Sequence, residues 1–179
     1  WHTDSGYEKT KKGFEASMEK LQLDYLDLYL IHQPFGDYYG SWRAMEELYE
    51  NKKIRAIGVC NFYPDRFLDL VEHNKIVPAV NQIEIHPLFQ REYDESIMKP
   101  YGTQMEAWSP LVRGEKILDN ETLKNIGAKY GKTPAQVILR WLIQRNIIVI
   151  PKSVHKERII ENFNIFDFEL SSDDMDKVK

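Results

Sequence analysis

Residues 54–61 read IRAIGVCN, a short apolar run that closes on the polar pair Cys60 and Asn61. A short run that is rich in β-branched residues and bounded by polar residues is typical of a strand buried on both faces. Four other stretches show the same pattern of a short apolar run, and each is followed by a residue of a type that is common in catalytic or binding sites. They are residues 28–31 before His32, 79–81 before Gln82, 104–107 before Trp108, and 147–150 before the sequence Pro151, Lys152, Ser153.

Helical patterns fill the sequence between these strands. Phe14, Met18 and Leu21 recur at helical spacing, and so do the apolar residues of 137–142. Residues 36–40, and residues 111–120 with Gly114, are predicted to be loops. We expect helices to begin near four residues that favour helix starts, namely Ser5, Pro64, Thr133 (followed by Pro134) and Ser171. Strands that alternate with helices predict a parallel sheet in an α/β fold.

The strand ends matter because a parallel α/β barrel gathers its active site at the carboxyl ends of its strands. A (β/α)8 barrel needs about 250 residues, whereas this chain has 179. We therefore expect a single domain, residues 1–179, that forms a partial TIM-type barrel with about five parallel strands and lacks the N-terminal three. The strands that end at His32 and Pro151 are expected to be exposed edges.

The composition excludes several classes of function. The net charge of −4 argues against nucleic-acid and membrane-surface partners, and no apolar run is long enough to span a membrane. Cys60 is the single cysteine, so an internal disulfide is excluded and a reducing, cytoplasmic location is expected. The histidines lack metal-ligand spacing, so no metal site is predicted. Because the chain starts at Trp1 and shows no signal peptide, we expect a processed or truncated chain, or part of a longer one.

The residues after the strands suggest a site for a carbonyl compound and a flat ligand. His32 is suited to donate a hydrogen bond to a carbonyl oxygen or to transfer a proton, with a buried structural histidine as the alternative. Asn61 and Gln82 could hold a carboxamide through paired donor and acceptor contacts, or could satisfy loop backbone instead. Trp108 could stack on a heteroaromatic ring, or could be part of the core.

The strongest local signal is a basic helix start near residue 152. Lys152, Ser153, His155 and Arg158 flank the first turn of a predicted helix, where free N–H groups and the helix dipole attract anions. Two cations and a hydroxyl there suit a phosphate group, and a solvated charged helix start is the alternative. Glycine-rich phosphate motifs of the common kinds are absent.

Taken together, these motifs resemble the aldo-keto reductase family. The matching stretches run through almost the whole chain in the family's order, and they resemble bacterial members that reduce small aldehydes, dicarbonyls or keto acids. They are LDLYLIH at 26–32, IGVCNF at 57–62, NQIE at 81–84, EAWSPL at 106–111, IPKS at 150–153, ENF at 161–163 and FDFEL at 166–170.

The resemblance implies a (β/α)8 barrel that binds extended NADP(H) without a Rossmann motif. Asn61 and Gln82 would hold the nicotinamide carboxamide, Trp108 would stack on the nicotinamide ring, and Cys60 stands beside them where a serine is usual. The other cofactor contacts implied by the resemblance are Ser109 and Leu111 at the pyrophosphate, Lys152, Ser153 and Arg158 at the adenosine 2′-phosphate with Val154 among them, and Glu161 and Asn162 at the adenine.

By the same resemblance, His32 is the active-site histidine that orients the substrate carbonyl. Gln33 stands where a tryptophan is common, and it is expected to affect substrate preference. The family's catalytic tetrad is aspartate, tyrosine, lysine and histidine, and this sequence carries only the histidine. The other three belong to the first three strands of the barrel, and the lysine normally lies two residues before the tryptophan that Trp1 resembles.

We therefore expect part of an NADPH-dependent reductase of aldehydes and ketones, with the 179-residue chain inactive by itself. Its expected partners are a small carbonyl substrate and, at the open sheet edges, an N-terminal segment or a second copy. Two alternatives stay open. One is a truncated remnant without catalysis that binds nucleotide or has a structural role. The other is a different barrel enzyme, in which Lys152 and Arg158 hold the phosphate of a phosphorylated metabolite.

Overall fold

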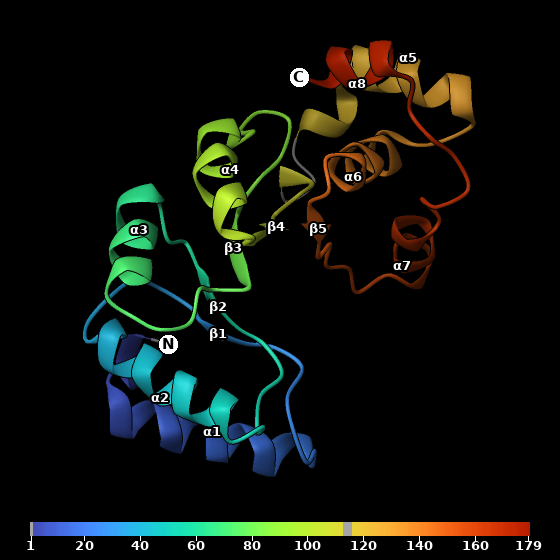
Figure 1. Ribbon diagram of the computed structural model, residues 1–179. Coiled ribbons are helices and arrows are strands. Elements are labelled where there is room, and N and C mark those ends of the chain that lie inside the picture. Colours follow the sequence, from blue (N-terminus) through green and yellow to red (C-terminus); the bar gives the residue numbers. More distant parts are fainter. Residues whose placement is uncertain (1, 113–115) are drawn as a thin grey trace. The chain divides into compact units, whose positions relative to one another are not determined.

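The computed structural model describes residues 2–112 and 116–179, which form two compact units (Figure 1). Within the described residues, the first unit comprises 2–83 and Tyr93–Gln104, and the second unit comprises Glu84–Glu92, 105–112 and 116–179. Trp1 and Gly114, which enter the expectations above, lie outside the described residues. The expectation of one domain over residues 1–179 stays a prediction.

Parallel strands in chain order form the sheet of the first unit, as predicted. β1 (Tyr29–Ile31) pairs with β2 (Ile57–Cys60), and β2 pairs with β3 (Val80–Glu84). The other elements run from blue to green in Figure 1. They are η1 (His2–Asp4), α1 (Tyr7–Leu21), α2 (Tyr38–Glu50), α3 (Pro64–Glu72), α4 (Glu92–Met98) and η2 (Lys99–Tyr101).

The helices of the first unit form where their apolar stripes meet the core. Trp42 and Met45 on α2 are almost fully buried, and so are Phe67 and Leu70 on α3. These are the inward faces that the helical spacing predicts. Burial of such large side chains is the main favourable term in folding, so these positions fix how α2 and α3 lie.

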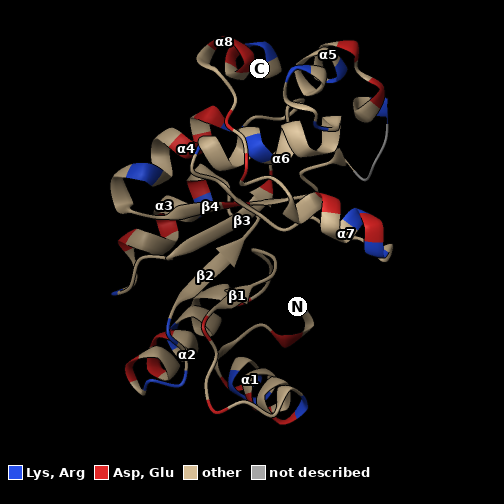
Figure 2. Ribbon diagram, turned by 90° about the vertical axis from the view of Figure 1, so that its right-hand side faces the viewer, with Lys and Arg blue, Asp and Glu red and all other residues tan. Residues whose placement is uncertain are grey.

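In the second unit, β4 (Gln104–Trp108) pairs with β5 (Ile148–Val149), again in parallel. The register places Glu106 opposite Ile148 and Ala107 opposite Val149. The other elements are η4 (Lys116–Asp119), α5 (Glu121–Tyr130), α6 (Pro134–Gln144), α7 (Lys156–Phe163) and α8 (Ser172–Val178). Figure 2 shows acidic and basic residues interspersed on α1, α7 and α8.

Three of the four predicted helix starts are confirmed. Pro64 opens α3, Thr133 caps α6, and Ser171 caps α8 by accepting a hydrogen bond from Asp174 N. The prediction for Ser5 is wrong, because Gly6 is the N-cap of α1, and it has a φ of 102° that a residue other than glycine rarely adopts.

A second correction concerns the predicted loop at residues 36–40. Helix α2 already begins at Tyr38, because Asp37 caps it and accepts a hydrogen bond from Gly40 N at 2.8 Å. A Cβ at position 40 would lie only 2.1 Å from Asp37 Oδ2. The missing side chain of Gly40 therefore makes room for the cap, and the glycine marks a helix start rather than a loop.

The expected burial of the five strands holds only for some of them. β2 is fully buried, whereas β1 is half-buried and Ile148 of β5 is exposed. Helix α7 also departs from the usual pattern, since Ile159, Ile160 and Phe163 are all exposed. Within the described residues, no helix is both long and apolar enough to cross a membrane.

Candidate functional site

The carboxyl ends of β1, β2 and β3 meet at one edge of the first unit's sheet. His32 directly follows β1 and Asn61 directly follows β2. Gln82 lies opposite Cys60 within β3, which continues to Glu84, so the prediction that this strand ends before Gln82 is wrong. Asn61 joins the three strands, because its Nδ2 donates to the His32 carbonyl at 3.3 Å and its backbone N–H donates to the Gln82 carbonyl at 2.9 Å. The structure thus brings together three of the predicted site residues.

Asn61 can make both bonds because its backbone turns sharply after β2. Its φ is 60°, in the left-handed region that asparagine tolerates better than most residues. His32 is exposed, and Asn61 and Gln82 are half-buried, so the three side chains border solvent. The Cys60 side chain is 3% exposed, so it lies beneath this edge rather than on it.

A cavity of about 500 Å³ lies in the first unit between α1, β1 and α2, and His32 is among its lining residues. Tyr29 and Ser17 also line it. Burial raises the pKa of the Tyr29 phenol above its usual 10, and the nearby negative charge of Asp4 raises it further. Tyr29 is therefore a poor proton donor at neutral pH. Gln33, the predicted substrate residue, follows His32 and is half-buried.

In the second unit, Trp108 is the last residue of β4, and Ser109 and Leu111 lie in the loop that follows it. All three are half-buried. Ser109 has a φ of 52°, and its carbonyl accepts a hydrogen bond from Val112 N at 2.9 Å. This tight turn directly after the strand fixes the backbone next to the tryptophan.

Of the predicted phosphate-binding residues, Lys152, Ser153 and Val154 lie between β5 and α7 of the second unit, and Arg158 lies in the first turn of α7. Ser153 Oγ accepts a hydrogen bond from His155 N at 3.1 Å, and this bond orders the approach to the helix. Lys152, Val154 and Arg158 are exposed. Neither of the two cations forms an ion pair with a carboxylate within residues 2–112 and 116–179. Two such cations at a helix start are suited to bind a dianion.

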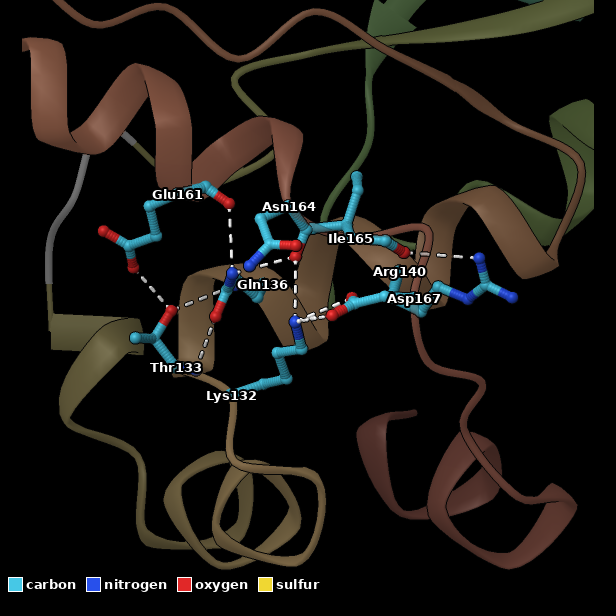
Figure 3. A network of polar contacts seen from close by, with 8 residues as sticks. All are labelled: Lys132, Thr133, Gln136, Arg140, Glu161, Asn164, Ile165 and Asp167. Atoms are coloured by element: carbon cyan, nitrogen blue, oxygen red, sulfur yellow. Dashed lines mark hydrogen bonds and ion pairs between the residues drawn. The ribbon is translucent and has the colours of Figure 1, made fainter.

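Glu161 and Asn162 lie in the last turn of α7, where a polar network joins that helix to α6 (Figure 3). Thr133 Oγ1 donates to Glu161 Oε1 at 2.5 Å. Gln136 Nε2 donates to the carbonyls of Glu161 and Asn164, at 3.1 and 2.9 Å. The carboxylate predicted to contact adenine therefore rests against the N-terminus of a neighbouring helix.

The roles of Thr133 and Gln136 at α7 were missed in the sequence, although one signal was present. A threonine followed three residues later by glutamine is the pattern of a capping box, and both reciprocal bonds of that box are formed. The pattern predicts a helix start, but it does not say that the same two side chains also bind another helix.

Asn162 also lines an apolar groove of about 1240 Å³ in the second unit. Ile150 of the segment after β5, Ile159 and Phe163 of α7, and Phe166 line the same groove, and all four are exposed. An exposed apolar surface of this kind marks a place where another surface or ligand packs.

Comparisons with known proteins agree with this arrangement. The sequence model of the Aldo/keto reductase family matches residues 1–179. Glyoxal reductase from Bacillus subtilis (strain 168) is 53% identical over 179 residues, which are 99% of this chain and 64% of that protein. The chain thus spans less than two thirds of the length of this relative.

Solved structures give the same result. MGS-M4, an aldo-keto reductase from a Medee basin deep-sea metagenome library, superposes with a TM-score of 0.97 at 45% identity, over 99% of this chain and 67% of that one. A mutant of Gox0644 in complex with NADPH superposes with a TM-score of 0.96 at 39% identity, over 99% and 66%. The parallel strands described above are part of the family's (β/α)8 barrel, and the chain belongs to the aldo/keto reductase family.

Proposed function

We propose that this chain is part of an NADPH-dependent reductase that converts small aldehydes and ketones to alcohols. The observation that carries the proposal is the joined strand edge of the first unit, where Asn61 binds the backbone of both His32 and Gln82. It gathers a hydrogen-bond donor for a carbonyl oxygen and two amides for a carboxamide at the strand ends, where barrel enzymes have their active sites.

Each unit, taken by itself, offers groups that suit one end of NADP(H). In the first unit, Asn61 and Gln82 offer amide groups for the nicotinamide carboxamide, with Cys60 beneath them. In the second unit, the exposed cations Lys152 and Arg158 stand near Ser153 at the start of α7, which suits a 2′-phosphate. Trp108, Ser109, Leu111, Val154, Glu161 and Asn162 complete the proposed cofactor residues. When bound, the cofactor supplies a hydride.

His32 would orient the substrate by donating a ring N–H to its carbonyl oxygen, and this hydrogen bond polarises the carbonyl. A similar relative is named glyoxal reductase, which supports small aldehydes and dicarbonyls as substrates of this chain's parent enzyme. Gln33, next to His32, is the residue that we propose to affect the choice among them. The single cysteine supports a reducing compartment such as the cytoplasm.

We further propose that the 179 residues do not turn over substrate by themselves. His32 is the only member of the family's tetrad in this sequence, and catalysis also needs an acid that gives a proton to the substrate oxygen. Two tyrosines of the first unit, Tyr29 and Tyr39, are unsuited to replace it. Tyr29 has a raised pKa, and Tyr39 donates its hydroxyl proton to Asp69.

The remaining part of the proposal concerns protein partners. The apolar groove of the second unit and the half-buried strand β1 are surfaces that a further polypeptide segment would cover. That segment is either another stretch of a family-length polypeptide or a second copy of this chain. The two sources differ in whether the chain associates with itself in solution.

Titration of the 179-residue chain with NADPH, followed by cofactor fluorescence, tests the proposal. We expect saturable binding that NADP competes away and that ribose 5-phosphate does not affect. If the chain bound ribose 5-phosphate and not NADPH, the result would favour the alternative of a different barrel enzyme that acts on a phosphorylated metabolite. Absence of binding by both ligands would favour a structural remnant.

A further inference from the structure

The N-terminus of α6 holds the end of α7 that carries the proposed adenine residues. Figure 3 shows the side chains of Thr133 and Gln136 directed toward Glu161 and Asn164. Lys132 adds to the contact, since its Nζ lies 2.7 Å from Asp167 Oδ1 and 3.3 Å from the Asn164 carbonyl. All these residues belong to the second unit.

The side-chain amide of Gln136 is held by three hydrogen bonds. Its Oε1 accepts from Thr133 N at 3.0 Å, and its Nε2 donates both of its protons, one to the Glu161 carbonyl and one to the Asn164 carbonyl. Gln136 is only 5% exposed, so these bonds are shielded from water. The backbone of the last turn of α7 is therefore fixed to α6.

The bonds of Thr133 then fix the Glu161 carboxylate. Thr133 Oγ1 accepts from Gln136 N at 3.3 Å, so its single proton is available for Glu161 Oε1, at 2.5 Å. A hydroxyl has one donor, and a carboxylate only accepts, so the direction of this bond is determined. One carboxylate oxygen is held, and the other points away from Thr133 (Figure 3).

We propose that Thr133 is a positioning residue, which holds Glu161 so that its second carboxylate oxygen accepts a hydrogen bond from the 6-amino group of adenine. This inference rests on the proposed function, because it takes Glu161 as an adenine contact. Adenine carries an amino donor at position 6, and hypoxanthine carries a carbonyl oxygen there. A fixed carboxylate thus discriminates between the two bases, and a loosely held one discriminates less.

The test compares NADPH with its hypoxanthine analogue, because both ligands carry the same charge. A substitution that changes the electrostatics of the phosphate site should change both dissociation constants by the same factor. The ratio of the two constants therefore reports only on the contact with the base. A lost hydrogen bond to a charged group weakens binding on the order of tenfold or more. We therefore expect the unsubstituted chain to prefer NADPH by about that factor.

Two substitutions separate the helix cap from the hold on Glu161. Thr133→Ser keeps the cap acceptor and the donor, and it should keep the preference. Thr133→Asp keeps a good cap acceptor but cannot donate to Glu161, and it should bring the ratio close to one. A third substitution, Thr133→Ala, removes the cap acceptor and the donor together without adding charge, and it should also bring the ratio close to one. Thermal unfolding of each variant, followed by circular dichroism, verifies that α6 and α7 still form.

A double substitution tests the route of the effect. Glu161→Ala should remove the preference, and adding Thr133→Asp to it should change the ratio no further, because both act through the same carboxylate. A wild-type ratio in Thr133→Asp or Thr133→Ala would overturn the inference while leaving the proposed function in place. A ratio near one in the unsubstituted chain would also overturn it, and failure of that chain to bind NADPH at all would reject the proposed function itself.

Discussion

Arg158 is the residue whose removal should separate the two nicotinamide cofactors. It is exposed at the start of α7, and within the described residues no carboxylate pairs with it. If it binds the 2′-phosphate, Arg158→Ala should weaken NADPH roughly ten- to a hundredfold and leave NADH almost unchanged, since only NADPH carries that group. Fluorescence titration with both cofactors measures this.

The matched control for Arg158 is Arg43→Ala, which removes an exposed arginine from α2 of the first unit. It should leave both dissociation constants unchanged. If Arg158→Ala weakened the binding of NADPH and NADH equally, Arg158 would not be a contact of the 2′-phosphate.

Gly58 shows how closely the strands that carry the site approach each other. A Cβ at this position of β2 would lie 2.5 Å from the Val80 carbonyl oxygen and 2.8 Å from Leu30 Cδ2. Gly58→Ala should therefore destabilise the chain by about 1–3 kcal/mol, the usual cost of overpacking. Urea unfolding gives the free energy of both proteins.

Gly13 in α1 is the control for Gly58, because a Cβ there would meet only Tyr29 Oη at 3.6 Å, an ordinary contact. Gly13→Ala should raise stability by about 0.5–1 kcal/mol, since alanine favours a helix interior over glycine. If the free energy of unfolding of Gly58→Ala equalled that of Gly13→Ala, position 58 would accommodate a Cβ, and the close approach of Val80 and Leu30 would not constrain β2.

At the scale of elements, Asp174 joins α8 to α5. Its carboxylate accepts from Lys129 Nζ at 2.5 Å, from Tyr130 Oη at 2.7 Å and from Ser171 Oγ at 3.1 Å. These donors, with Lys129 first, hold the pKa of this buried carboxyl below its usual range. A lowered folded-state pKa means that the ion contributes stability above the unfolded value of about 3.9 and loses it as the pH falls through the folded value.

Asp174→Asn should therefore destabilise the chain at neutral pH and flatten the fall in stability below about pH 4. Thermal unfolding of both proteins between neutral and acid pH measures the two slopes. Asp173→Asn is the control, because that carboxylate is largely exposed and pairs with Lys177 on the same helix. If the two variants gave parallel curves, the buried ion would not be the cause of the acid sensitivity.

The elements that were predicted well are those fixed by local chemistry. The start of α6 is set by Thr133 and Pro134, and neither needs a tertiary contact to act. The start of β2 was predicted three residues too early, at Ile54 rather than Ile57. Ile54 forms only an isolated bridge with Leu26, and that pairing depends on another part of the chain.

The candidate site divides in the same way. The places of His32 and Asn61 were predictable, because the apolar pattern shows where β1 and β2 end and a parallel sheet aligns those ends. Gln82 was expected just after its strand, but β3 continues to Glu84, so Gln82 lies within it. The hold of Gln136 and Thr133 on α7 joins residues about 25 positions apart. No local pattern encodes which helix a capping side chain will reach, so this part of the site required the structure.

For the whole molecule, the exposed apolar groove of the second unit predicts association. Phe163 is 76% exposed and lines the groove beside Ile159. Light scattering during size-exclusion chromatography should show a mass that rises with concentration. Phe163→Asp should shift the chain toward the monomer, and Phe35→Asp, which changes an exposed phenylalanine of the first unit, should not. A chain that stays monomeric at every concentration would contradict self-association.

Activity is the property that depends most on the whole molecule. In the proposed reaction, His32 orients a carbonyl and Asn61 holds a carboxamide, but neither supplies the proton that reduction requires. An unperturbed tyrosine has a pKa of about 10, and burial raises that of Tyr29. Loss of a positioned general acid typically costs about 10²–10⁴-fold, and loss of the tetrad's lysine and aspartate adds to it. We therefore expect no measurable NADPH-dependent reduction of methylglyoxal by the 179-residue chain.

Turnover should appear when a polypeptide with the first three barrel strands of a family member is added, because it brings the missing acid and the lysine that lowers the acid's pKa. The restored rate should then fall on His32→Ala, whereas His73→Ala, which removes an exposed histidine at the end of α3, should leave it unchanged. Absorbance of NADPH at saturating methylglyoxal follows each reaction. Rapid turnover by the purified chain alone would show that some residue within it provides the proton, and the proposal that it needs a second polypeptide would fail.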